Sequence, residues 1–159
     1  LCASSPDTPE IGEETAKAVE QLQAERGESS VIWVKEQVAR PSLVQLFTHA
    51  LAFVCPSIYE PLGIVNLEAM ACETAVVASA VGGIPEVVVD GVTGLLVEYD
   101  AADARGFEER FAAAVNELAS DPTRAKSMGL AGRARAVEQF GWDSIADQTI
   151  AVYRGALGA

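Results

Sequence analysis

Two glutamates, Glu60 and Glu68, flank a glycine in a segment suited to phosphate binding. Glu60 opens a turn-forming run that ends at Gly63 and joins a predicted strand to a predicted helix. Gly63 has no Cβ, so its backbone can approach phosphate oxygens closely. A helix N-terminus offers unpaired N–H groups and the positive end of a dipole. We therefore predict a diphosphate site at this turn.

The spacing of the two carboxylates suggests what they bind on either side of a diphosphate. Glu68 lies five residues after Gly63, about 7 Å along a helix that rises about 1.5 Å per residue. Its carboxylate can reach a ribose diol, while Glu60 can accept hydrogen bonds from the hydroxyls of a sugar on the other side. The alternative is that both are ordinary acids at the start and on the surface of a helix.

Prolines and glycines mark the edges of the same predicted site. We expect Pro61 to open the helix, where a missing N–H costs nothing. Gly82 and Gly83 close the next predicted strand and let the backbone approach a ligand at that strand's carboxyl end. The alternative for this pair is a plain tight turn.

Three other segments carry weaker signals. His49, the only histidine, ends a predicted helix, where an imidazole suits the dipole, so we assign it no catalytic role. Residues 90–94 read D-G-V-T-G and predict a turn without chemistry. Residues 34–38 follow a strand and are a candidate contact for the base, by analogy of fold.

Short apolar, β-branched runs alternate with longer amphipathic stretches, which is typical of strands covered on both faces by helices. The predicted strands are Leu1 to Ala3, Val31 to Val34, Leu51 to Cys55, Ala75 to Ala80 and Gly94 to Val97. The helices between them are Pro9 to Arg26, Pro41 to His49, Pro61 to Ala71 and Pro85 to Val89. Because such crossovers are right-handed, the sheet should be parallel. We predict an α/β, Rossmann-like fold with one open sheet of five strands.

After the last strand the pattern becomes wholly helical. Phe107, Phe111, Val115 and Leu118 recur at helical spacing, and Asp121-Pro122 restarts a second helix. A third helix should run from about Asp143 to Ala156. Its apolar stripe, which comprises Ile145, Thr149, Val152, Tyr153 and Ala156, could pack on this domain or on another.

The composition bounds the class of protein. A chain of 159 residues, half of them hydrophobic, suits one globular domain. Its net charge of −12 disfavours nucleic acid as a partner. No apolar run approaches the roughly 18 to 20 residues of a membrane span, and the first residues lack a signal-peptide pattern, so we expect a cytoplasmic protein. Its three cysteines show no zinc or redox spacing and should be buried, reduced thiols.

Three motifs together resemble the family 4 retaining glycosyltransferases. They are S-x-Y-E-P-x-G-x-x-x-x-E-A-M-A from residue 57, V-V-A-S-x-V-G-G-I-P-E from residue 76, and D-G-x-T-G-L-L-V from residue 90. The resemblance covers nearly the whole chain. It implies the C-terminal, nucleotide-sugar-binding half of the two-domain GT-B fold. Residues 56–77 are most similar to the actinobacterial glycogen synthase and α-maltose-1-phosphate synthase type, which implies ADP-glucose as donor.

The resemblance also assigns roles to residues of the motif. It implies that Glu60 contacts the donor glucose in the catalytic site and that Glu68 binds the ribose hydroxyls. The amides of four residues would lie near the phosphates and sugar: Leu62, Gly63, Ile64 and Val65. The expected reaction transfers glucose with retention of the α configuration, and no metal or cofactor is expected.

The resemblance further implies parts that these 159 residues do not supply. An Arg and a Lys that neutralise the diphosphate would precede Leu1, and a glucan or sugar-phosphate acceptor would bind a missing N-terminal domain. We therefore expect a truncated domain, inactive alone. Two alternatives stay open: a transferase that uses GDP-mannose or a UDP-sugar, and a nucleotide-binding module without catalysis.

Overall fold

The computed structural model describes residues 2–3, 6 and 8–158. The chain divides into two compact units, residues 1–43 and residues 44–159. Each unit has its own small parallel sheet. The candidate site belongs to the second unit.

The first unit consists of a long helix between two very short strands. Strand β1 (Cys2–Ala3) pairs in parallel with β2 (Trp33–Val34). Helix α1 (Pro9–Arg26) begins at Thr8, whose hydroxyl accepts a hydrogen bond from the Ile11 amide at 3.3 Å. A 3-10 turn, η1 (Glu28–Ser30), follows it. The helix ends at Gly27, whose φ of 96° is not helical. Glycine suits this position because residues with a side chain rarely adopt that conformation.

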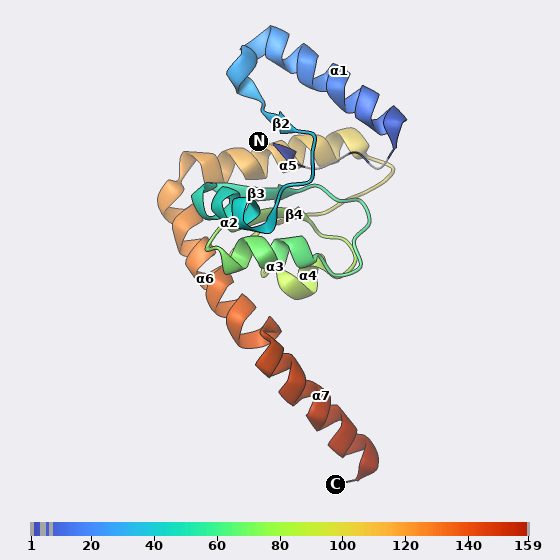
Figure 1. The fold of residues 1–159 in the computed structure, drawn as a ribbon, viewed down its shortest axis with the longest axis vertical. Coiled ribbons are helices and arrows are strands. Elements are labelled where there is room, and N and C mark those ends of the chain that lie inside the picture. Colours follow the sequence, from blue (N-terminus) through green and yellow to red (C-terminus); the bar gives the residue numbers. More distant parts are fainter. Residues whose placement is uncertain (1, 4–5, 7, 159) are drawn as a thin grey trace. The chain divides into compact units, whose positions relative to one another are not determined.

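The second unit is built on a three-stranded parallel sheet in the order β3-β4-β5. Its strands are β3 (Ala52–Cys55), β4 (Ala75–Ser79) and β5 (Gly94–Val97). Helix α2 (Arg40–His49) precedes β3, α3 (Ile64–Ala71) connects β3 to β4, and α4 (Ile84–Val87) lies between β4 and β5. Figure 1 shows α3 and α4 together beside the sheet.

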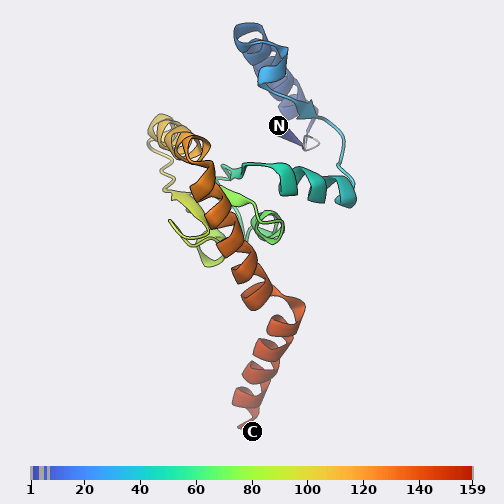
Figure 2. The same ribbon diagram turned by 90° about the vertical axis from the view of Figure 1, so that its left-hand side faces the viewer.

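Three helices follow the sheet: α5 (Ala104–Ser120), α6 (Pro122–Phe140) and α7 (Trp142–Leu157). Asp103 and Asp121 cap α5 and α6 through their carboxylates. Helix α7 contacts α6 and continues beyond the sheet (Figure 2), and it buries none of its described residues. No residue of its apolar stripe is therefore buried among the described residues of this unit.

Strand β4 lies at the centre of the core and is buried along its whole length. One face of the sheet meets α5 and α6, through a cluster that includes Val77, Phe107, Phe111 and Leu118. The other face meets α3, which also contacts α4, and Met70, Ile84 and Val87 of these two helices are fully buried. Burial on both faces explains the continuous apolar run of β4.

The α/β class and the helical C-terminal segment are confirmed, but the single five-stranded sheet is wrong. Within the described ranges, the strands form a pair and a separate set of three. Strands β1 and β2 have two residues each, so they supply only a short ladder. Leu1, the predicted first strand residue, lies outside the described residues.

The start of α3 is a second correction. The helix begins at Ile64 and not at Pro61, because Gly63 has φ of 89°, which no α-helical residue adopts. Of the cysteines, Cys55 is a buried free thiol and Cys72 a half-buried one, and nothing is described of the Cys2 side chain. No helix in the described part of the chain is long and apolar enough to cross a membrane.

Helix α6 crosses the end of α3 at Gly129, and this contact predicts a site of low tolerance. A Cβ at Gly129 would overlap the backbone carbonyl of Glu73, so Gly129→Ala should lower the free energy of unfolding. We expect a loss of about 1–3 kcal/mol, as for other overpacked sites, measured by urea denaturation.

Gly155→Ala is the matched control, because Gly155 is also helical and has open space where its Cβ would lie. The gain in helix propensity should leave this variant as stable as the wild type or more so. Equal effects of the two substitutions would contradict a tight crossing at Gly129.

Candidate functional site

Two loops meet at the carboxyl edge of the three-stranded sheet. Residues 56–63 follow β3, and residues 80–83 follow β4. The amide of Gly83 donates a hydrogen bond to the carbonyl of Glu60 at 3.1 Å. A Cβ at Gly82 would overlap that same carbonyl oxygen, and a Cβ at Gly83 would overlap the carbonyl of Pro61. The two loops thus touch backbone to backbone, which only glycine allows here.

Gly63 is the N-cap of α3 and has no side chain with which to cap it. Instead, the Glu60 carboxylate reaches forward three residues and accepts a hydrogen bond from the Gly63 amide at 3.0 Å. A negative charge at this position suits the positive end of the helix dipole. Glu60 is therefore held at both ends, through its backbone carbonyl and through its carboxylate.

The N–H groups of Ile64 and Val65 are the first two of α3 and have no partner within the helix. The Ile64 side chain is 64% exposed, so this end of the helix is open to solvent. Leu62 is half-buried and Pro61 is exposed. The loop thus presents backbone donors, as an anion site requires.

Glu68 lies in the second turn of α3 and is half-buried, as is Glu60. Its carboxylate has no hydrogen bond or ion pair to any residue that the structure describes. The two glutamates therefore flank the N-terminal turn of one helix, at the sheet edge where ligands settle in parallel α/β folds.

The sequence analysis missed Asn66, the third residue of α3. It is fully buried, and neither its Nδ2 nor its Oδ1 has a hydrogen-bond partner among the described residues. Asn66 shares the inner face of the helix with Ala69 and Met70. A polar residue at a core position of an otherwise apolar helical face was the signal that could have revealed it.

Arg135 of α6 holds helix α4, which directly follows the second loop. Its guanidinium donates to the carbonyls of Glu86 and Val87 at 2.7 and 2.8 Å, which closes the C-terminal end of α4. Residues 90–94 form the predicted turn, in which Asp90 accepts a hydrogen bond from the Leu96 amide. Neither set of hydrogen bonds involves a residue of the two loops.

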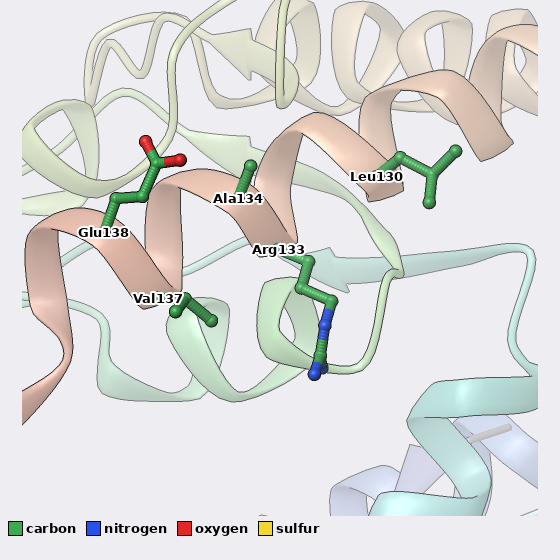
Figure 3. A pocket seen from close by; sticks show the side chains of 5 residues that line it. All are labelled: Leu130, Arg133, Ala134, Val137 and Glu138. Atoms are coloured by element: carbon green, nitrogen blue, oxygen red, sulfur yellow. The ribbon is translucent and has the colours of Figure 1, made fainter.

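A hollow of about 350 Å³ lies elsewhere, along α6 (Figure 3). Its lining residues, all from this helix, are Leu130, Arg133, Ala134, Val137 and Glu138. The Arg133 guanidinium already donates to the Ala71 carbonyl and lies 3.9 Å from a Glu73 oxygen. Because no glutamate or glycine of the two loops lines it, this hollow is separate from the candidate site.

Two of the weaker candidates lie apart from these loops in the chain. His49 is the last residue of α2, as predicted, and is exposed. Residues 34–38 belong to the first unit, so their proximity to a ligand stays a prediction.

A family model described as "Glycosyl transferases group 1" matches residues 11–135. The chain belongs to this family. This glycosyl transferase sequence is 58% identical over 154 residues to the alpha-maltose-1-phosphate synthase of Mycolicibacterium smegmatis, across 97% of the chain. It is also 39% identical over 145 residues to the D-inositol 3-phosphate glycosyltransferase of Kribbella flavida, across 91% of the chain.

Solved structures agree on the fold. The match to the sucrose-phosphate synthase of Thermosynechococcus elongatus covers 98% of this chain and 37% of the synthase chain, with a TM-score of 0.74 and 35% identity. The match to Anabaena HepE covers 96% of this chain and 39% of the HepE chain, with a TM-score of 0.77 and 23% identity. These neighbours confirm the GT-B-type α/β domain predicted from the motifs.

The glycosyl transferase chain is shorter than its relatives. It spans 39% of the length of the M. smegmatis synthase and 32% of the K. flavida enzyme.

The contact between the loops predicts that alanine substitutions at two glycines with left-handed backbone lower the free energy of unfolding by unequal amounts. Gly82 and Gly91 have φ of 52° and 72°. Alanine at either should cost about 1–2 kcal/mol of stability in strain. Gly82→Ala should cost more, because its Cβ also overlaps the Glu60 carbonyl, whereas Gly91 has open space. Urea denaturation of both variants measures the difference; equal losses would contradict the contact.

Proposed function

We propose that this chain is the donor-binding part of a glucosyltransferase that uses ADP-glucose to make α-glucan, glycogen or α-maltose 1-phosphate. One observation carries the proposal. The Gly63 amide and the first N–H groups of α3 are flanked by two carboxylates, that of Glu60 in the loop before the helix and that of Glu68 in its second turn. The 58% identity to an alpha-maltose-1-phosphate synthase supports glucose transfer.

Each part of the donor has a candidate partner. The diphosphate would lie near the amides of residues 62–65 and bind the N–H groups of Ile64 and Val65, with the Gly82–Gly83 backbone beside them. The Glu68 carboxylate would accept hydrogen bonds from the ribose hydroxyls. Glu60 would accept hydrogen bonds from the glucose hydroxyls through the carboxylate that now caps Gly63.

In the proposed reaction, the bond between glucose C1 and the diphosphate oxygen breaks and ADP leaves. A new bond forms between C1 and an acceptor hydroxyl oxygen, whose proton is released. The N–H groups at the start of α3 would stabilise the negative charge that develops on the leaving diphosphate. We propose that no metal ion is needed for this.

The acceptor site and further cationic groups would come from the rest of a longer protein, because the relatives are more than twice as long as the match. We accordingly expect this chain to bind donor without turning it over.

The choice of donor is tested by titration calorimetry of the chain with ADP-glucose, ADP, GDP and UDP, in the presence of EDTA. We expect selective binding of ADP-glucose and ADP. Glu68→Ala should weaken both by about 10- to 100-fold, the usual worth of hydrogen bonds to a charged group. Glu60→Gln should weaken ADP-glucose more than ADP, because only the first carries the sugar.

Glu108→Ala serves as the control, since Glu108 is an exposed glutamate of α5 with no role in the proposal. Preference for GDP or UDP would contradict ADP-glucose as the donor and favour GDP-mannose or a UDP-sugar instead. Binding that persists unchanged in Glu68→Ala would contradict the ribose contact, and loss of binding in EDTA would contradict metal independence.

A further inference from the structure

The contacts within the fold do not explain why the carboxamide of Asn66 is buried. A carboxamide offers two donor hydrogens and an acceptor oxygen. Buried polar groups are nearly always hydrogen-bonded, so an unpaired one needs an explanation. Asn66 is 0% exposed, and neither of its polar atoms is bonded within the described residues. It cannot touch a ligand from this position, so any role it has must act through a neighbouring group.

The neighbour is Gly63. Asn66 is the third residue of α3, and the Cβ of a helical residue points back toward the N-terminus. Its Nδ2 lies 2.6 Å from the point where a Cβ on Gly63 would stand. In a capping box, a Glu or Gln side chain at the third helical position accepts a hydrogen bond from the amide of the N-cap residue, and Asn66 occupies that position. Here that amide already donates a hydrogen bond to the Glu60 carboxylate.

Glu60 therefore faces two demands under the proposed function. Its carboxylate is needed by the donor glucose, yet it is the group that satisfies the Gly63 amide. Gly63 is buried, so its N–H would lose its partner without replacement by water if the carboxylate turned away. A second acceptor beside Gly63 would remove this cost.

We propose that Asn66 is a positioning residue for Glu60: its Oδ1 accepts the Gly63 N–H when the Glu60 carboxylate turns to the donor sugar. Rotation of the carboxamide by half a turn exchanges Oδ1 and Nδ2 with little change of shape. Because neither atom is bonded to a described residue, this rotation breaks no hydrogen bond. The part of this inference that concerns sugar rests on the proposed function.

The exchange of acceptors can be tested without ligand, by measuring amide hydrogen exchange of Gly63. In Glu60→Ala the N–H should pass to Asn66 and stay protected. In Glu60→Ala combined with Asn66→Leu, protection should fall by at least about tenfold, because one buried hydrogen bond is lost. The Gly83 amide, bonded to the Glu60 backbone carbonyl, is the internal reference and should not change. Equal loss in Glu60→Ala alone and in the double variant would overturn the proposal.

The consequence for donor binding is tested on variants of Asn66 alone. Asn66→Leu should weaken ADP-glucose by about tenfold relative to ADP, and Asn66→Gln should restore most of the difference. Asn66→Ala, which adds no volume, replaces leucine if that variant does not fold. A glucose-dependent gain in affinity that is unchanged in every variant without a carboxamide would overturn the proposal.

The sugar contact of Glu60 and the transfer of the Gly63 amide to Asn66 can be tested separately. A wild-type chain that binds ADP-glucose no better than ADP would contradict the proposed sugar contact of Glu60. The ligand-free exchange experiment would then still decide whether Asn66 can take the Gly63 amide.

Discussion

The hydrogen bond from the Gly83 amide to the Glu60 carbonyl joins the two loops that make up the candidate site. It forms only because neither Gly82 nor Gly83 has a side chain to keep the loops apart. Strands β3 and β4 are parallel neighbours, so their carboxyl ends bring the loops to one edge. Arg135 binds the last carbonyls of α4, the helix that directly follows the second loop. The position of Glu60 therefore depends on backbone packing that begins in the sheet.

A consequence of this arrangement is that Glu60 performs a structural task where a ligand would bind. Its carboxylate takes the place at the helix N-terminus that the dipole makes favourable for an anion. A donor sugar would compete with that internal contact for the carboxylate, while a donor diphosphate would bind the neighbouring N–H groups. The proposed transfer of the Gly63 N–H to the buried, unpaired Asn66 would compensate for the change. Under this proposal, donor binding and helix capping are linked through a single amide, that of Gly63.

Much of this could be predicted from the sequence, because the signals were local or periodic. Helix α1 and strand β5 have the predicted bounds, and the apolar spacing of α5 identified its buried face. The meeting of the two loops followed from the parallel sheet. The start of α3 was predicted three residues too early, since proline suits a first turn and a glycine such as Gly63 can adopt either sign of φ. The role of Asn66 was not predicted, although its helical spacing with Ala69 and Met70 places it on an apolar face, because its lack of a hydrogen-bond partner depends on tertiary packing.

The central claim is that the N-terminus of α3 binds the diphosphate of a nucleotide sugar. Amide chemical shifts, recorded by NMR while ADP-glucose is added to the chain, test it most directly. The account predicts the largest changes at Gly63, Ile64 and Val65, with a smaller change at Gly83. Changes centred on the hollow along α6, with the α3 amides unaffected, would contradict it.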